Sequence, residues 1–373
     1  NIMSQAKLIR VEEAENGIKL TFLDFDGNEK TGVYNGKKLN LENFEDKIAK
    51  SNLKFGDVLY YLDHYVYFKL LRLPILGLQN DEIAKFLIND GIIVKQANSL
   101  YSITNLGAIL FARNLKEFGL ERKALRFINY DGISKIRGNH ELIDESGYAI
   151  AFNRFFSYVL AFVPSKEDYE SISRIEIFNI PSNLLKELIL NALIHQDFTI
   201  DGSGVMIECF SNRIEITNPG APLIDVNKIA DSHHLSRNPK LVNLMDKLGF
   251  NNDLTAGRDT VIQTCEKYCL PAPGFKIFDE FTQVTVYPPT EFKDISFDEK
   301  LWTCFLHALY CLKQNEFMTK SSLKKRFGLK SNQNYSISKL IKSAIDKNLL
   351  AIVDPTVTSR YLKFRLGSKY NLK

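Results

Sequence analysis

The sequence predicts an α+β fold: an α/β sandwich whose helices lie on one face of a mostly antiparallel sheet, flanked by winged-helix-like domains. Two patterns lead to this prediction. In residues 122–290, strand-like segments joined by tight turns are separated by amphipathic helices. On either side of this block, helices and short strands follow the order of a winged helix. A chain of 373 residues is also long enough for about two to three domains.

The composition is that of a soluble globular protein, with 45% hydrophobic and 25% charged residues. No apolar run approaches the roughly 18 residues of a membrane span, and no signal peptide opens the sequence, which predicts a cytoplasmic protein. The five cysteines lack CxxC spacing. Neither a disulfide framework nor a zinc site is therefore expected.

Positive charge is concentrated near the C-terminus. Residues 291–373 contain 16 Lys and Arg against 7 Asp and Glu, whereas the whole chain has a formal net charge of only +4. An excess of basic residues favours an anionic partner, most simply DNA, because neutralising phosphates releases condensed counterions. A solvated surface that only keeps the protein soluble would explain the same charge equally well.

The first 121 residues predict two small units. Residues 1–56 are expected to be β-rich, because their strand-like alternation is interrupted by Asn-Gly and Asp-Gly pairs suited to hairpin turns. Residues 57–121 show helices followed by a short hairpin, a winged-helix outline. Acidic residues at Asp81, Glu82 and Asp90 make packing or interdomain contact a better expectation for this unit than phosphate binding.

The central block is expected to run strand, helix, helix, two strands, two helices and a closing strand. Ser182 and Asn183 mark the start of the second helix, because their side chains can accept bonds from first-turn N–H groups. Strands are expected at 123–130, 205–210, 214–217 and 280–288. Helices are expected at about 148–162, from Pro181 onward, after Asn238 and after Gly257.

The C-terminal block, residues 291–373, again has the outline of a winged helix-turn-helix. Helices are expected at 298–314, Lys320–Phe327 and about 333–348, and strands near 349–353 and 360–366. Its third helix would be the recognition helix, whose amides and hydroxyls can reach base edges. A protein interface or dimer contact is the competing interpretation. The candidate DNA-binding residues are Lys324, Lys325, Arg326, Gln333, Asn334, Tyr335 and Lys339.

A polar stripe crosses the second helix of the central block. Within the mostly apolar stretch LKELILNALIHQDF, residues 185–198, Glu187, Asn191 and His195 recur every four positions and so lie on one side of the helix. Taken alone, the solvated face of an amphipathic helix would be the more common explanation. The motifs Asn218-Pro219-Gly220 and Ser236-Arg237-Asn238-Pro239 follow later in the sequence, and the family resemblance that these motifs carry together, given next, shifts the balance toward a nucleotide site.

In this order, these motifs resemble the divergent ATP-binding domain of bacterial transcriptional regulators related to the RecG helicase. That domain is similar to the ATPase module of gyrase, MutL, sensor histidine kinases and heat-shock chaperones. The resemblance covers about residues 66–290, with the C-terminal winged helix in the family's usual place. The family's N-terminal schlafen-like nucleic-acid-binding module is not recognised in residues 1–60.

The resemblance implies a role for several residues. In the family's pattern, Glu187 orients and deprotonates the attacking water, and Asn191 binds the Mg²⁺ held on the nucleotide phosphates. His195 and Asp197 also match family positions; His195 is a candidate cofactor-binding residue that could face the phosphates or be structural, and Asp197 has no assigned role. Four further positions would line the ATP pocket: Asn218, Gly220, Arg237 and Gly257.

Two departures from the wider ATPase group bear on the cofactor. Asn218 stands where gyrase-like ATPases have an adenine-binding Asp, so that carboxylate contact cannot be carried over. The phosphate-covering loop keeps one glycine, Gly257, where relatives have a Gly-x-Gly pair, and Arg258 could replace the lost backbone contacts.

Together these features predict an ATP- and Mg²⁺-binding transcriptional regulator whose winged-helix domains bind DNA in a nucleotide-responsive way, and a possible homodimer. A weak Mg-dependent ATPase activity is left open. The alternative is a nucleotide-free or non-hydrolysing DNA-binding or protein-interaction scaffold. An ATP-powered DNA-remodelling enzyme is disfavoured, since the sequence contains no G-x-x-x-x-G-K-[S/T] motif.

Overall fold

The structure, a computed structural model, describes the backbone of residues 7–14, 17–23 and 29–34, and residues 44–367 except 137, 164, 169–174, 179, 221–235, 251–256, 279, 330–333 and 360. For residues 165–168, 175–178, 257–260 and 334 it describes the backbone alone. The chain divides into two units, Asn1–Asn43 and Phe44–Lys373. No helix among these described residues has the length and apolar character needed to cross a membrane.

The first unit contains a three-stranded antiparallel sheet of β1 (Lys7–Ala14), β2 (Gly17–Leu23) and β3 (Glu29–Tyr34). Ala14 pairs with Gly17, and residues 15–16, which include Asn16 of the first expected turn, lie outside the described residues. Residues 24–28, with the second expected turn at Asp26-Gly27, lie outside the described residues. The β-rich character expected for this segment is therefore present.

The second unit opens with a module of four helices and a small sheet, which we call the N-terminal module. Its sheet has the order β4-β6-β5 and is antiparallel. β4 precedes the boundary expected at residue 57, yet it pairs with β6, so its residues belong to this module. The elements are the short 3-10 helix η1 (Phe44–Asp46), β4 (Ile48–Leu53), α1 (Phe55–Tyr61), α2 (His64–Leu70), α3 (Asn80–Asn89), β5 (Ile93–Lys95), β6 (Tyr101–Thr104) and α4 (Asn105–Phe111).

Acidic residues of the N-terminal module contact the central domain. Lys247 Nζ lies 2.6 Å from Asp90 Oδ1. The buried Glu45 carboxylate accepts hydrogen bonds from the backbone N–H groups of Lys240 and Leu241, in the first turn of α7 (Pro239–Lys247). A carboxylate there stabilises the helix, because it satisfies free N–H groups and faces the positive end of the helix dipole. Asp90 therefore makes a contact between the N-terminal module and the central domain.

The central domain is built on a six-stranded sheet with the order β13-β14-β12-β11-β7-β8. β7 and β11 run parallel, and all other neighbouring pairs are antiparallel, so the mostly antiparallel sheet of the predicted α+β fold is confirmed. The strands are β7 (Leu125–Tyr130), β8 (Gly138–Asp144), β11 (Met206–Phe210), β12 (Arg213–Pro219), β13 (Gly274–Phe278) and β14 (Phe281–Val286). Strands β9 (Ser165–Asp168) and β10 (Ile175–Phe178) pair antiparallel in a separate two-stranded sheet.

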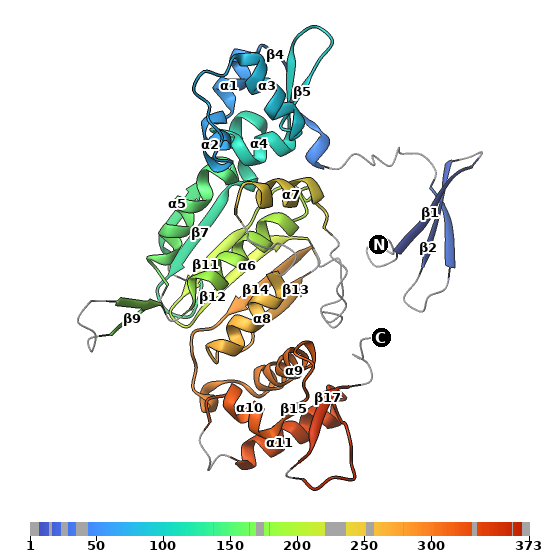
Figure 1. The fold of residues 1–373 in the computed structure, drawn as a ribbon, viewed down its shortest axis with the longest axis vertical. Coiled ribbons are helices and arrows are strands. Elements are labelled where there is room, and N and C mark those ends of the chain that lie inside the picture. Colours follow the sequence, from blue (N-terminus) through green and yellow to red (C-terminus); the bar gives the residue numbers. More distant parts are fainter. Residues whose placement is uncertain are drawn as a thin grey trace. The chain divides into compact units, whose positions relative to one another are not determined.

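Helices α5 (Tyr148–Leu160), α6 (Ser182–His195) and α8 (Gly257–Lys267) lie over this sheet (Figure 1). α6 begins at Ser182, as expected, but no side chain caps it. The Asn183 amide instead lies 3.5 Å from Thr264 Oγ1 on α8. The Asn183 side chain therefore contacts a neighbouring helix and does not cap the first turn of α6.

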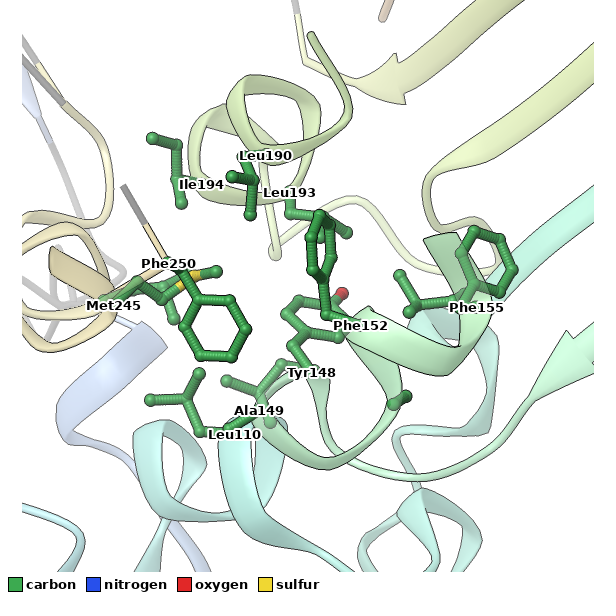
Figure 2. Packing of buried hydrophobic residues seen from close by; sticks show 14 of the residues in the cluster. Leu110, Tyr148, Ala149, Phe152, Phe155, Leu190, Leu193, Ile194, Met245 and Phe250 are labelled. Atoms are coloured by element: carbon green, nitrogen blue, oxygen red, sulfur yellow. The ribbon is translucent and has the colours of Figure 1, made fainter. Parts of the chain in front are cut away.

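The main core lies between these helices and the sheet and extends into the N-terminal module. In Figure 2, Phe152 of α5 is surrounded by apolar side chains from α4, α6 and the end of α7. Its ring stacks with Phe156 at a centroid distance of 5.9 Å and meets Phe250 edge-on at 5.7 Å. One continuous core therefore holds the polar stripe of α6 in place.

The last part of the chain, which we call the C-terminal module, has three helices and a three-stranded antiparallel sheet, β15-β17-β16. Its buried residues form a second core that also contains Ile262 and Ala272 of the central domain. The elements are α9 (Phe297–Lys313), β15 (Met318–Thr319), α10 (Lys320–Arg326), α11 (Asn334–Asp346), β16 (Leu350–Ile352) and β17 (Lys363–Leu366).

Candidate functional site

α6 carries Glu187 and Asn191 one helical turn apart. Asn191 Nδ2 donates a hydrogen bond to Glu187 Oε1 at 3.0 Å. Both residues are half-buried, whereas His195, one further turn along, is exposed. The rest of the helix is mostly apolar and buried. The stripe is thus a partly enclosed pair followed by an exposed imidazole, and not a wholly solvated face.

The environment of this pair suits acid–base and cation chemistry. Burial raises the pKa of the Glu187 carboxyl above its usual 4.5, although the Asn191 hydrogen bond and nearby Lys186 act in the opposite direction. A raised pKa makes a carboxylate a better proton acceptor. The bond between the two residues uses the amide nitrogen, so the amide oxygen is the Asn191 atom suited to a hard cation such as Mg²⁺.

Three segments that are distant in sequence meet just beyond the end of α6. The backbone N–H of Asp197 donates to the Pro219 carbonyl at 2.8 Å. Arg237 Nε lies 3.7 Å from Asp197 Oδ2, and Arg237 Nη1 donates to the His195 carbonyl at 3.5 Å. The structure therefore brings together the His-x-Asp, Asn-Pro-Gly and Arg-Asn-Pro motifs.

Gly220 makes this close approach sterically feasible. Its φ is +109°, in the region that favours glycine, and a Cβ there would lie 3.0 Å from Asp197 Cβ and 3.2 Å from Arg237 Nη1. The Gly220 carbonyl accepts a hydrogen bond of 2.7 Å from Thr282 Oγ1 on β14. Gly220 is thus needed for this close packing whether or not a ligand binds.

Asn238 has a role that its sequence pattern did not predict. It is the N-cap residue of α7, followed by Pro239, but its side chain makes no capping bond. Its Nδ2 instead donates to the carbonyls of Ile194 and Gln196, both at 2.8 Å. This buried amide fixes the C-terminal end of α6, which contributes to placing the polar stripe.

The expected adenine residue, Asn218, is buried near the end of β12. Its Nδ2 donates to the Pro219 carbonyl at 3.2 Å. Its amide oxygen is the atom that could accept a hydrogen bond from an adenine amino group.

The expected phosphate loop is described only in part. Gly257 is the first residue of α8 and Arg258 the second, so a helix does begin where the loop was predicted to end. The Arg258 side chain and residues 251–256 lie outside the described residues.

Several of the predicted DNA-binding residues lie on exposed surfaces of the C-terminal module. Tyr335 is 80% exposed, and Lys339 and Lys342 are exposed on the same helix. Lys325 on α10 is exposed and Lys324 half-exposed. Gln333 and the side chain of Asn334 lie outside the described residues.

Arg326 differs from the other predicted DNA-binding residues. Its side chain is only 2% exposed, and its Nε donates to Glu266 Oε1 of α8 at 2.8 Å. Its second nitrogen, Nη2, donates to the Leu270 carbonyl. Because the guanidinium is used inside the protein, we exclude Arg326 from the proposed DNA-binding face.

Comparison with known proteins agrees with this architecture. Residues 202–286 match the family described as "Putative ATP-dependent DNA helicase recG C-terminal". The central domain is ATPase-like. The match spans β11, β12, α7, α8, β13 and β14 and begins after α6, so Glu187, Asn191 and His195 precede the matched segment.

The fold is also similar to a solved structure, that of the DIP2311 protein from Corynebacterium diphtheriae. The two chains are 14% identical with a TM-score of 0.53, and the similarity covers 97% of this chain and 76% of that one. At this identity the likeness concerns the fold alone. No curated protein matches the chain.

Proposed function

We propose that this protein is an ATP-binding transcriptional regulator, whose central domain takes up Mg²⁺ and ATP and whose C-terminal module is a winged helix that binds DNA. The observation that carries the nucleotide site is the half-buried Glu187–Asn191 pair on α6, next to the point where Asp197, Gly220 and Arg237 meet. The ATPase-like type of the domain supports the same proposal.

The chemistry of each residue fits one part of this function. Mg²⁺, when bound with ATP, would neutralise phosphate charge and polarise the terminal phosphoryl group. Asn191 would supply an oxygen ligand to that cation. Glu187, whose pKa is raised by burial, would orient a water molecule and accept its proton. Asn218 would contact the base, and Gly257 and Arg258 would lie near the phosphates.

The Asn191→Ala variant tests the nucleotide site. We expect isothermal titration calorimetry to show Mg·ATP binding at least about tenfold weaker than in the wild type, since a contact to a charged group contributes roughly 1.5–3 kcal/mol. The matched control is Asn153→Ala, which makes the same change on an exposed position of α5 and should leave affinity unchanged. Equal affinities for wild type and Asn191→Ala would remove Asn191 from the site.

The DNA-binding part of the proposal rests on charge and exposure. The region 291–373 has nine more basic than acidic residues, 16 against 7. The outward face of α11 combines Tyr335 with Lys339 and Lys342, while Ile337, Leu340 and Ile341 pack into the core. A helix with an apolar inner face and a basic outer face is suited to the major groove.

Lys339→Gln should weaken binding to duplex DNA and lower the slope of log affinity against log salt by about one, as expected for one lost phosphate contact. Fluorescence anisotropy over a salt series measures both quantities. Lys116→Gln, at an exposed lysine that follows α4 in the sequence, is the matched control. An unchanged slope for Lys339→Gln would take this lysine out of the interface.

A non-hydrolysing scaffold is the second candidate. It is favoured by the single glycine, Gly257, where gyrase-like relatives carry a Gly-x-Gly pair. A wild-type protein that binds DNA but shows no heat of binding with Mg·ATP at millimolar concentration would favour this second candidate.

A further inference from the structure

Helix α8 belongs to two hydrophobic cores at once. Val261 and Cys265, four residues apart, are buried in the core of the central domain. Ile262 lies one position along and is buried in the core of the C-terminal module. Side chains four residues apart lie on the same side of a helix, so α8 packs one side against each core. A displacement of α8 therefore disturbs both.

The end of α8 is also joined to the C-terminal module by charge. Glu266 Oε1 accepts from Arg326 Nε of α10 at 2.8 Å, and Glu266 Oε2 lies 2.7 Å from His307 Nδ1 of α9. The other ring nitrogen of His307 lies 3.0 Å from Ser322 Oγ of α10. One carboxylate on α8 thus holds two helices of the C-terminal module.

This connection is strong because it is enclosed. The side chains of Glu266, His307 and Arg326 are 10%, 7% and 2% exposed. Removing one partner from a buried ion pair leaves the other charge without compensation, which is strongly unfavourable. The end of α8 and helices α9 and α10 are therefore expected to move together, whereas an exposed ion pair would allow them to separate.

Different residues of α8 lie near the two proposed sites. Its first residue, Gly257, adjoins the predicted phosphate loop, and Thr264 in its third turn is within 3.5 Å of Asn183 on α6, the helix that carries Glu187 and Asn191. At its other end, Glu266 holds α10, which directly precedes the α11 helix with its exposed Tyr335 and Lys339.

We propose that α8 couples nucleotide binding to DNA binding, with Glu266 and Arg326 as the positioning residues that transmit its movement to α11. This inference rests on the proposed function, because it needs both a nucleotide site and a DNA site. Coupling between two sites is reciprocal: a nucleotide that changes DNA affinity must have its own affinity changed by DNA to the same degree.

The test measures this coupling in the wild-type protein. Affinity for a fluorescent duplex of mixed sequence is determined by anisotropy with and without a saturating non-hydrolysable ATP analogue and Mg²⁺, and analogue affinity is determined by calorimetry with and without the duplex. We expect each affinity to change by the same factor, about fivefold or more.

The Glu266→Gln variant then tests whether the coupling is transmitted through Glu266. Gln keeps the size and an acceptor oxygen but removes the charge that compensates Arg326, so the coupling factor should fall to below about twofold, while the analogue still binds. Asp298→Asn is the matched control, because Asp298 pairs with Lys347 at 3.6 Å within the C-terminal module and is exposed. It should leave the coupling factor unchanged.

The outcomes separate the two proposals. A wild type that binds the analogue and DNA with no mutual effect overturns the coupling and leaves the proposed function intact. A wild type that binds no analogue overturns the proposed function and the coupling with it. Full coupling in a folded Glu266→Gln protein overturns the route through Glu266. If Glu266→Gln does not fold, Arg326→Gln provides the same test, because it removes the other charge of the pair.

Discussion

Glu187→Gln should bind Mg·ATP as tightly as the wild type and hydrolyse it about 10²–10⁴-fold more slowly, the usual contribution of a general base. Gln preserves the size of the side chain and an oxygen toward Asn191 Nδ2, which now bonds Glu187 Oε1 at 3.0 Å. It cannot accept a proton from water. Calorimetry measures the binding, and release of inorganic phosphate measures the turnover.

The pH dependence of turnover gives a second readout of the same residue. Burial raises the pKa of Glu187 above 4.5, so the carboxyl remains protonated, and inactive as a base, at somewhat higher pH than an ordinary glutamate. The rate should therefore fall as the pH is lowered through this raised pKa, with a midpoint above 4.5. A rate that stays constant down to pH 4.5 would contradict this assignment.

Glu141→Gln is the matched control, because it makes the same change at an exposed position of β8, and we expect wild-type turnover. Wild-type turnover in Glu187→Gln as well would mean that another group activates the water. Binding without turnover in the wild type would instead favour the non-hydrolysing scaffold.

Much of the fold could be predicted because it follows from local patterns. The apolar repeat of α6, the Asn238-Pro239 start of α7 and the Thr319 start of α10 each produced an element within a few residues of its expected position. Strands β11 and β12 were predicted equally well, since the tight turn Ser211-Asn212-Arg213 separates two strand-like segments.

Other features depend on contacts between distant residues, which no local pattern encodes. β8 was not predicted, because its residues are largely exposed and it forms by pairing with β7. Arg326 was expected on the DNA-binding face because it stands beside Lys324 and Lys325, yet it pairs with a carboxylate 60 residues earlier in the chain. The capping of α7 by Glu45, 196 residues before Leu241, is equally non-local.

The same distinction applies to the candidate site. The spacing of Glu187 and Asn191 on one helix was enough to place them together, because four residues make about one turn. That Gly220 and Arg237 would lie in one pocket was implied by the family resemblance and by no spacing rule, and the contact of Asp197 with both was not predicted. The buried amide of Asn238, which holds the end of α6, had no sequence signal beyond that of a helix cap.

Phe152→Ala should lower the free energy of unfolding of the central domain by about 3–5 kcal/mol, the usual cost of truncating a buried aromatic side chain. Phe152 is fully buried, and Figure 2 shows it where α5 meets Leu190 and Leu193 of α6 and Phe250 beyond α7. Alanine would leave a cavity among these elements and remove two ring contacts, with Phe156 and Phe250.

Urea unfolding followed by far-UV circular dichroism measures this loss. Fluorescence of the single tryptophan, Trp302, would report on the C-terminal module instead. The matched control is Phe278→Ala, at a position of β13 that is 50% exposed, where we expect a loss of no more than about 1 kcal/mol. Because Phe152 packs directly against α6, Phe152→Ala should also weaken Mg·ATP binding. Equal stability losses in the two variants would show that α5 does not form part of the core that positions Glu187 and Asn191.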